Sequence, residues 1–527
     1  MKKFKYIFLL LLFTSVSSCE KFLEEDPFSS VDPGSLFTNE QGALAAVNAT
    51  YKLMSSNQDY YGREFLYITE ATTEAITTRR DASDERGQMD NWLWDPNHSF
   101  LALTWVSAYR VINAANGVIE NVPVIDMDES LANRIVGEAK FLRAINYFNL
   151  VRLWGDVPIR TEQIKGATES LELERRSAAE VYDLIISDLE EAINVLPTRS
   201  GYDAYDGANT GRVTQGAAQT LLAKVYLQRG SNPEVSMAGD FQKCLDYCNA
   251  VIASNEYILV DEYRSIFDVN SENGPEVIFD IQHTAIAGLG GDVSGHVVPR
   301  RSGIGRTSFG NLHAEVPWYK TLNQNGDQRI DSFILQYVLD GDTITYDPDD
   351  FENDNYVHDG PGLFKLAEFD ATIPEDAAES PNKVLLRYAD VLLMKAEAIN
   401  EINSGPNGEA YDVINEVRER AGIGELTAGL DYQQFKDAVF TERRKELVFE
   451  YHGWFDGLRN WDTFIDRVLA NVQTRNENID AGIWPGGTNA APRFFTNQDI
   501  RSDKFKLFPV PQSIMDTNSK LDQNPDW

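Results

Sequence analysis

The stretch "GEAKFLRAINYFNLVRLWGDVPI", residues 137–159, carries the periodicity that decides the fold class. It ends a longer pattern over residues 129–154, in which apolar side chains recur every three or four positions, at Leu131, Ile135, Ala139, Leu142, Ile145 and Phe148. This spacing is typical of an amphipathic helix with one buried face. Gly155 and Pro158 end the pattern, so the sequence predicts a long helix over residues 129–154.

Similar helical patterns occupy much of the chain, at residues 36–55, 101–120, 177–195, 212–229, 239–254, 383–403, 408–421 and 431–451. Two pairs of them share one layout: "LLAKVYLQRG" (221–230) precedes "FQKCLDYCNAVIAS" (241–254) as "LLMKAEAINE" (392–401) precedes "AYDVINEVRERAG" (410–422). Alternating small and large apolar residues favour closely packed antiparallel helices, as in degenerate tetratricopeptide-like repeats. The fold class is therefore predicted to be mainly α.

The intervening region, residues 256–382, is rich in Gly, Asp, Asn and Pro and contains short extended runs such as "EVIFDI". We interpret it as loops and small strands on a helical scaffold, where binding residues concentrate. The expected organisation is one composite domain over residues 19–527, with helical parts at about 19–255 and 383–527.

The N-terminus has the order of a secretory signal peptide, with Lys2, Lys3 and Lys5, then "YIFLLLLF", then small residues. The run is too short to span a bilayer, so removal of residues 1–18 is expected. Residues 16–19, "VSSC", resemble a bacterial lipobox, which makes Cys19 the predicted site of lipid attachment. The alternative is an ordinary signal peptide that happens to precede a cysteine.

The balance of 82 acidic against 47 basic residues gives a net charge of −35. A surface of this sign disfavours nucleic acid and anionic polysaccharides as partners. Cys244 and Cys248 share one predicted helix face, where core packing is the expected role of a free cysteine. A zinc site would need two further ligands, and no His or Cys stands nearby in the sequence.

Five segments from Cys19 to Trp527 resemble the SusD/RagB family, in the order of that family: "CEKFLEEDP", "GEAKFLRAINYFNLVRLWGDVPI", "LLRYADVLLMKAEAINE", "ERRKELVFEYHGWFDGLRNW" and "LFPVPQSIMDTNSKLDQNPDW". The resemblance implies a fold with about four tetratricopeptide-like helix pairs. It implies a lipid-anchored protein exposed on the outer membrane. It also implies a SusC-like TonB-dependent transporter as partner, and capture of glycans for import as the function.

Glycan binding needs flat aromatic rings for the apolar faces of sugars, flanked by polar groups for the hydroxyls. The loop "TTRRDASDERGQMDNWLWDPNHS", residues 77–99, supplies both. Trp92 and Trp94 would point the same way if the stretch is extended, and their spacing to Asn97 is similar to that of a starch-binding member of the family. The alternative is that one or both rings pack beneath the loop. The polar candidates are Arg79, Arg80, Asp81, Asn91 and Asn97.

A second aromatic pair, Trp318 and Tyr319 in "EVPWYK", follows a Gly-rich segment. The resemblance implies that this part of the chain contributes to the binding face, with Trp318 as a third platform; the alternative is that Trp318 only anchors its segment. Arg300, Arg301 and Arg306 favour an anionic glycan, whereas the tryptophan spacing favours a neutral glucan of the starch or laminarin type. The neutral glucan is our prediction.

Enzymatic function is not predicted, because no "GxSxG", "HExxH" or phosphate-binding glycine loop is present in the sequence. No cofactor is expected. "NQNGDQRID", residues 323–331, loosely resembles a calcium loop, but its glycine comes too early, so we interpret it as a turn, with a structural calcium ion as the alternative. The function hypothesis is a non-catalytic glycan-capturing lipoprotein. The alternatives are a lid that captures peptides or proteins and a structural adaptor of the transporter.

Overall fold

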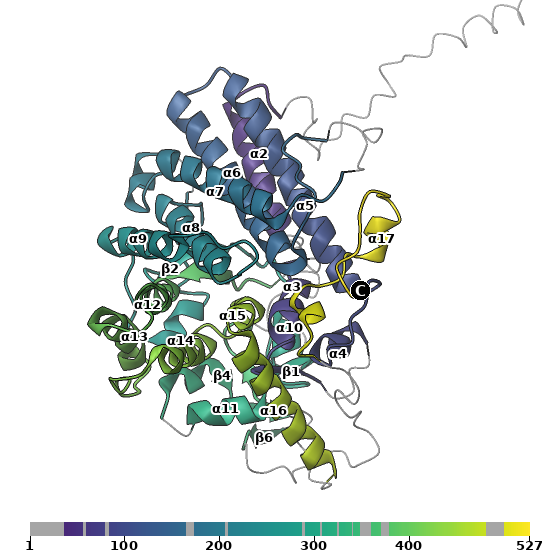
Figure 1. The fold of residues 1–527 in the computed structure, drawn as a ribbon, viewed down its shortest axis with the longest axis vertical. Coiled ribbons are helices and arrows are strands. Elements are labelled where there is room, and N and C mark those ends of the chain that lie inside the picture. The colour runs from purple at the N-terminus through teal and green to yellow at the C-terminus, as the bar shows by residue number, and fades with distance from the viewer. Residues whose placement is uncertain are drawn as a thin grey trace, which may run out of the picture.

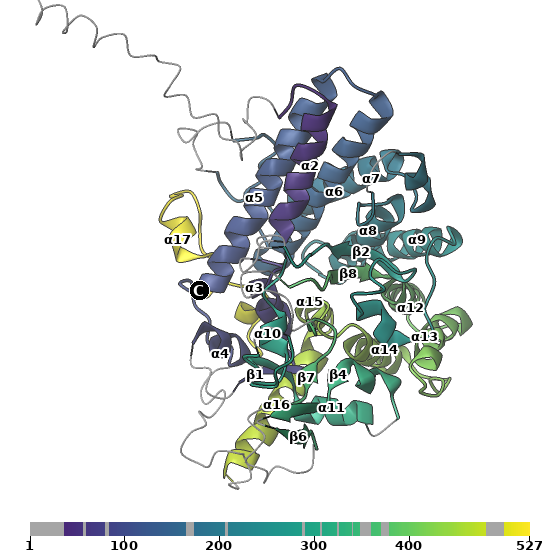
Figure 2. The same ribbon diagram turned by 180° about the vertical axis from the view of Figure 1, so that it is seen from behind.

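The computed structural model describes residues 36–55, 60–79, 84–164, 173–205, 209–286, 290–305, 308–323, 326–339, 341–347, 360–369, 379–480 and 500–527. Helices dominate these residues, and the strands are short (Figures 1 and 2). The predicted mainly α fold is confirmed. The signal peptide and Cys19 lie outside the described residues.

Four helix pairs form a continuous stack that runs from the top of Figure 1 to its lower left. The pairs are α2 (Glu40–Met54) with α5 (Ser99–Asn121), α6 (Glu129–Trp154) with α7 (Ala178–Val195), α8 (Gln215–Gly230) with α9 (Asp240–Ala253), and α12 (Tyr388–Asn403) with α13 (Gly408–Arg420). Each pair also touches the next, through α5 and α6, α7 and α8, and α9 and α12. The two pairs predicted from their shared layout are α8/α9 and α12/α13. In the first of them Cys244 and Cys248 are buried free thiols, as expected.

Helix α6 has the predicted bounds, because Asp128 caps its first turn and Gly155, with a φ of 70°, ends it. Its burial differs from the prediction of a single apolar face. Every residue from Phe141 to Trp154 is buried, since α2, α5, α7 and α8 all contact the helix. Polar residues on the other faces are paired inside the core: Arg143 donates to both oxygens of Asp188 at 2.8 and 2.7 Å.

The region between α9 and α12 contains short strands and helices, as predicted. Its strands form antiparallel two-stranded sheets: β2 (Val277–Ile281) with β8 (Lys383–Arg387), β4 (Phe333–Ile334) with β7 (Gly362–Leu363), and β5 (Gln336–Leu339) with β6 (Asp342–Thr345). Strand β3 (Leu312–Ala314) pairs instead with β1 (Ile76–Thr78), from the N-terminal part. The short helices here are α10 (Ser294–Val297) and α11 (Val316–Asn323), with 3-10 turns at Tyr263–Phe267 and Gln328–Ser332.

The remaining helices surround this region, except for α17, which lies beside α5 at the right of Figure 1. They are α3 (Glu64–Leu66), which continues into a π-helical turn at Tyr67–Ala71, α4 (Glu85–Asp90), α14 (Tyr432–Glu446), α15 (Gly453–Arg459), α16 (Trp461–Asp480) and α17 (Gln512–Met515). Further 3-10 turns lie at Val122–Val124, Ser200–Ala204 and Asp503–Lys506. Among the described residues, none of the helices combines the length and the apolar character needed to cross a bilayer.

A buried network of ion pairs joins α14 to β2, β8 and the turn at 328–332. We call it the central ion-pair network; its members are Glu276, Asp327, Arg329, Lys365, Arg387, Arg420, Glu442, Glu446 and Glu450. Arg387 lies at its centre, with Nη1 2.7 Å from Glu276 and 2.6 Å from Glu446. Because each charge has an opposite partner at hydrogen-bond distance, the network holds the strand region against the helical stack.

Candidate functional site

The structure places Trp92 and Trp94 in the core, where they are 1% and 3% exposed. Trp92 follows α4 with a φ of 54°, so the stretch is not extended and the expected alternation of side chains does not apply. The two rings lie 5.2 Å apart, and Trp92 packs 5.3 Å from Trp454. The prediction of an open tryptophan platform is therefore not met in this structure, which has both rings beneath the loop.

The second aromatic pair is also buried, with Trp318 6% and Tyr319 2% exposed. Both side chains belong to α11 and pack on Phe333, at ring distances of 6.1 and 5.5 Å. Trp318 thus anchors its segment and is not joined to the Trp92–Trp94 cluster as a third platform. The sequence pattern could not distinguish these arrangements, because a large aromatic residue suits both.

The polar candidates are separated. Asn91 donates to the Gly87 carbonyl and ends α4, while Asn97 is exposed in the turn before α5. Arg79 follows β1, and its Nη1 donates to the Phe309 carbonyl at 3.2 Å. Arg80, Asp81 and Arg306 lie outside the described residues.

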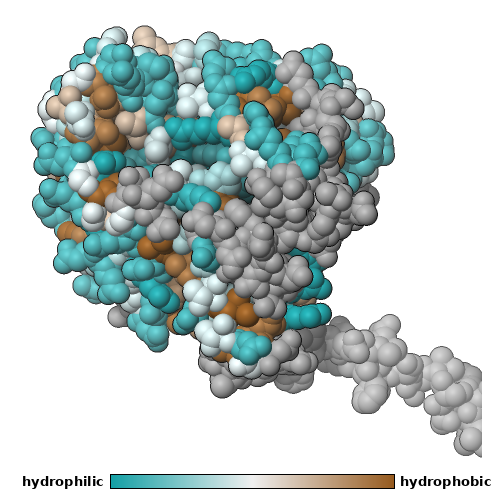
Figure 3. All heavy atoms as spheres, turned by 90° about the horizontal axis from the view of Figure 1, so that it is seen from below, coloured by the Kyte–Doolittle hydropathy of each residue, from teal (hydrophilic) through white to brown (hydrophobic). Residues whose placement is uncertain are grey.

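The two predicted segments nevertheless meet as backbone, since β1 pairs with β3 and Arg79 N donates to Asn311 O at 3.0 Å. Phe309, which is 45% exposed, lies at this junction. We call the junction the Arg79–Phe309 corner. On the face shown in Figure 3, hydrophobic residues form small separate groups among hydrophilic ones, which suits a polar ligand better than an apolar one.

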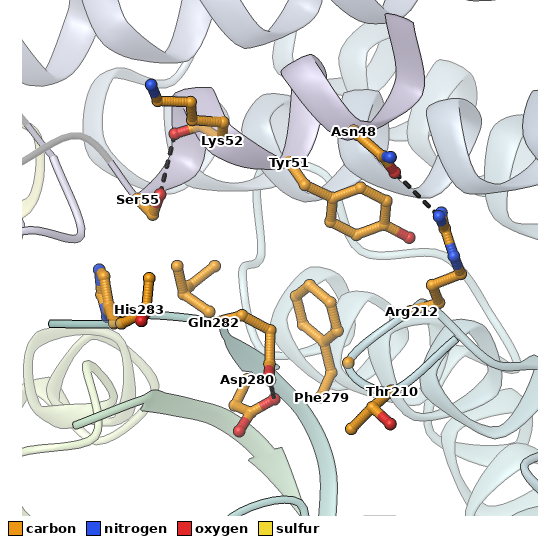
Figure 4. Close-up of a pocket in the computed structure, with 13 residues that line it drawn as sticks. Asn48, Tyr51, Lys52, Ser55, Thr210, Arg212, Phe279, Asp280, Gln282 and His283 are labelled. Atoms are coloured by element: carbon orange, nitrogen blue, oxygen red, sulfur yellow. Dashed lines mark hydrogen bonds between the residues drawn. The ribbon is translucent and has the colours of Figure 1, made fainter. Parts of the chain in front are cut away.

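A concavity lies between the C-terminal end of α2, the loop at 210–212 and strand β2. We call it the α2–β2 groove (Figure 4); it has a volume of about 430 Å³. Phe279 from β2 points toward the ring of Tyr51 from α2, whose hydroxyl is directed toward Arg212. Its polar lining comes from Asn48, Lys52, Ser55, Thr210, Arg212, Asp280, Gln282, His283 and Thr284.

A second compartment, of about 510 Å³, adjoins the groove and shares Thr210, Gly211, Arg212, Phe279 and Asp280 with it. It is lined by the aromatic residues Tyr202, Tyr205 and Tyr257 and by the polar residues Arg199, Asp203, Asn209 and Asn273. Gly211 lies in the lining that the two compartments share. Its φ is 80°, and a Cβ there would lie 2.5 Å from Gln282, so only glycine fits without displacing that side chain.

Amides join the rims of the two compartments. Asn273 and Gln282 exchange two hydrogen bonds, of 3.2 and 3.0 Å. Gln282 also donates its second N–H to Asp280, so it keeps only a carbonyl lone pair for a ligand, whereas Asn273 keeps one N–H and one lone pair.

Phe279, Tyr202 and Tyr257 are as buried as the tryptophans, so they form the floor of the site. Tyr51 and Tyr205 are half-buried, and their rings together with the amides are the groups that a sugar could contact.

The charges around the groove are largely compensated. Arg212 donates to Glu138 at 2.8 Å and to Asn48 at 2.9 Å. Burial raises the pKa of Asp280 to about 6, although hydrogen bonds from Asn382 and Gln282 oppose the rise. Burial and the nearby Lys383 lower the pKa of His283 to about 3, so this imidazole is neutral at pH 7. At pH 7 Asp280 is largely ionised and Lys52 adds an exposed positive charge, so the groove carries charges of both signs among its hydrogen-bonding groups.

The raised pKa of Asp280 gives a prediction about stability. The folded protein holds this proton more tightly than the unfolded chain, so the stabilisation present below about pH 4 is lost as pH rises toward about 6. Relative to Asp280→Asn, the wild type should lose on the order of 1 to 3 kcal/mol across that window. Urea denaturation of both proteins at about pH 4 and about pH 7 measures the difference. Parallel pH profiles would contradict the assignment.

The described residues contain no group of three or more His, Cys, Asp or Glu side chains arranged to hold a metal ion. In the predicted calcium-like turn, Asp327 pairs with Arg329, which donates to its two oxygens at 2.8 and 2.6 Å. The aspartate is therefore engaged in the central ion-pair network and is not available as a ligand. Residues 324 and 325 of this turn lie outside the described part.

Sequence reasoning missed the α2–β2 groove, because its lining comes from three segments that are far apart along the chain. Two local signals were present. "EVIFDI" indicates a strand, and Gly211 within "NTGR" indicates a tight turn. Neither signal says that the strand and the turn face the end of α2.

Comparison with known proteins connects this fold and chain to a family. Residues 318–527 match the model described as "SusD family", and residues 21–227 match the model described as "Starch-binding associating with outer membrane". SusD-like protein P2 of Formosa agariphila is 28% identical over 554 residues, covering 99% of each chain. Starch-binding protein SusD of Bacteroides thetaiotaomicron is 23% identical, covering 99% of this chain and 98% of that one.

Among solved structures, a SusD homologue from Bacteroides thetaiotaomicron superposes with a TM-score of 0.78 at 24% identity, covering 93% of this chain and 97% of that chain. This likeness supports the fold. The two models match opposite ends of the chain and together cover most of it. The five segments that resemble the family lie within these matches or at their edge. The chain belongs to the SusD/RagB family.

Proposed function

We propose that this protein is a non-catalytic, surface glycan-binding lipoprotein that captures oligosaccharides or polysaccharides and delivers them to a TonB-dependent transporter of the outer membrane. The observation that carries the proposal is the α2–β2 groove with its adjoining compartment, which combines aromatic rings with amide groups. Membership in the family supports it, because one matched model is described as starch-binding and outer-membrane-associated.

The ligand we propose is a neutral glucan of the starch or laminarin type. The Arg212 guanidinium is already paired with Glu138, so it offers little to an anionic sugar. The lining supplies mainly amides, hydroxyls and rings, which match the hydroxyl edges and apolar faces of neutral sugars. Sites of this kind bind in the micromolar-to-millimolar range once ordering costs are subtracted.

The same proposal includes the attachment and the partner. Removal of residues 1–18 would leave Cys19 as a lipidated N-terminus, and residues 19–527 would fold as one composite domain. A lipid anchor would hold the protein at the membrane without a spanning helix. A SusC-like transporter is the partner that would receive the glycan.

The test blocks the groove without removing a native contact. Thr210 is exposed and lines both compartments, so Thr210→Trp should fill their shared opening. The protein lacking residues 1–18 should be retarded in gels containing starch or laminarin. Thr210→Trp should weaken that retardation at least about tenfold, equivalent to about 1.4 kcal/mol. The matched control is Thr427→Trp, since Thr427 is an exposed threonine in a separate concavity beside α13.

Phe309→Ala completes the test, because it alters the Arg79–Phe309 corner and leaves the groove intact. If Phe309→Ala loses retardation and Thr210→Trp keeps it, the glycan-binding site would be the Arg79–Phe309 corner and not the α2–β2 groove. Absence of binding to starch, laminarin, mannan, xylan, pectin and a sulfated glycan, checked by calorimetry, would overturn the glycan proposal. The peptide-capturing lid or the structural adaptor would then take its place.

A further inference from the structure

A small cavity lies where α6 meets α8, β8 and the turn before α15. Its volume is about 30 Å³. The lining is mostly apolar, from Phe65, Ile145, Phe148, Leu221, Leu385 and Leu386. A space of this size matches the share of liquid volume that one water molecule occupies, so it admits one small guest only.

The guanidinium of Arg152 lines this cavity and is 9% exposed. It lies between two aromatic rings, 3.8 Å from the centroid of Phe148 and 3.4 Å from that of Phe455. Its Nε donates to the Phe148 carbonyl at 3.1 Å and its Nη2 to Asn149 Oδ1 at 2.6 Å. Both acceptors are neutral.

Within the described part of the chain, no carboxylate oxygen lies within 4.0 Å of Arg152, and Nη1 makes no hydrogen bond to protein. Burial and the nearby Arg459 lower its pKa to about 10, which still leaves it charged at pH 7. The other buried arginines described above have acidic partners, as Arg387 and Arg143 do. A buried guanidinium without a counter-charge destabilises the folded state. A bound anion beside Arg152 would offset this penalty.

Ionisable side chains of Lys224, His452 and Glu450 also line the cavity, beside Asn149, Tyr61 and Tyr451, and the hydrogen bonds of the first three fix their roles. Lys224 Nζ lies 2.6 Å from Asp390 and donates to His452 Nδ1 at 3.1 Å, so the neutral imidazole carries its proton on Nε2. His452 Nε2 is buried and has no acceptor among the described residues. Lys365 and Arg387 hold the Glu450 carboxylate, at 2.7 and 2.6 Å, so its charge is already compensated.

We propose that this cavity binds one monatomic anion of the halide class, chloride in a saline medium, held by the Arg152 guanidinium with the His452 imidazole beside it. A halide accepts hydrogen bonds from several donors and donates none, which fits a lining whose free groups are N–H donors. It also supplies a negative charge beside Arg152, which has no carboxylate partner among the described residues. The ion would tie α6 to β8 and to the segment before α15, at the junction of the helical stack with the strand region.

The experiment compares thermal unfolding in sodium chloride and in sodium gluconate at equal ionic strength, because gluconate is too large for the cavity. The wild type should have the higher Tm in chloride, since an ion that binds only the folded state stabilises it by mass action. Arg152→Met should abolish this difference. Arg176→Met is the matched control, since Arg176 is exposed, and it should retain the difference. Equal Tm values for the wild type in the two salts would overturn the proposal.

Crystals of the wild type grown in sodium bromide give a second readout that does not depend on the folding of a variant. An anomalous peak beside Arg152 Nη1 is expected. An ordered water at that position, with no anomalous signal, would show that the cavity is hydrated and would overturn the halide assignment. The outcome is independent of glycan binding, so a failure here leaves the proposed function untouched.

Discussion

Replacing Arg387 with methionine is expected to lower the free energy of unfolding by about 3–5 kcal/mol, the usual cost of removing one partner from a buried ion pair. Arg387 is fully buried and its guanidinium contacts the carboxylates of Glu276, Glu446 and Glu450 at 2.6–2.7 Å. Nearby arginines hold the pKa of Glu446 well below its usual range, so this carboxylate stays ionised in the core. Without Arg387, part of the negative charge of these three buried carboxylates would have no positive partner, and the folded state would lose stability.

Urea denaturation of the two proteins measures this loss, provided that the slope of the transition is unchanged. The control is Arg176→Met, because Arg176 and Glu180 form a pair of 3.5 Å on the surface, where the pair contributes at most about 1 kcal/mol. A change in Arg387→Met as small as that in Arg176→Met would mean that water reaches the central ion-pair network and screens it.

The second large effect is expected for Trp92→Ala, which should cost about 3–5 kcal/mol of stability, as other deletions of a buried aromatic ring do. The ring is 1% exposed, and its Nε1 donates to the Thr72 carbonyl at 3.1 Å. Alanine would leave a cavity next to Trp94 and Trp454. Leu93→Ala is the matched control, since Leu93 is 53% exposed and its replacement should change stability by about 0.5 kcal/mol or less.

This prediction affects how a binding result is interpreted. If Trp92→Ala lost glycan binding, the loss would first have to be separated from unfolding, by measuring the folded fraction under the binding conditions. Trp92→Phe keeps most of the volume and should keep the fold. Normal stability in Trp92→Ala together with lost binding would contradict the structure and restore the open platform predicted from the sequence.

Local patterns in the sequence were sufficient for the helices. The period of apolar residues in 129–154, with Gly155 after it, fixed the bounds of α6, and the matched layouts at 221–254 and 392–422 predicted two of the helix pairs. These features depend on neighbours three or four positions away. A single sequence contains that information directly.

The burial of charged residues could not be predicted in the same way. The run "ERRKE" at 442–446 has the composition of a solvated helix end, yet all five residues are buried. Their partners come from distant parts of the chain: Glu70 and Glu74 for Arg444, and Asp390 and Asp456 for Arg443. A net charge of −35 likewise says nothing about which charges are inside.

The candidate site could not be predicted from the sequence for a related reason. Whether Trp92 is open or buried depends on its positive φ and on Trp454, which is 362 positions further along the chain. The α2–β2 groove depends on residues near 50, 210 and 280 meeting in space. Contacts of this range are set by the assembled fold, which the family resemblance predicted as a whole and local patterns did not.

The central ion-pair network has a consequence for the kinetics of folding. Its members extend from Glu276 to Glu450, so it closes long loops of chain. The helix pairs form from local contacts, whereas ion pairs between distant segments can form only after those helices have assembled. Such late contacts affect the unfolding rate much more than the folding rate. In a chevron plot, Arg387→Met should therefore raise the unfolding rate and leave the folding rate almost unchanged. The central ion-pair network would then determine how long the native protein persists before it unfolds.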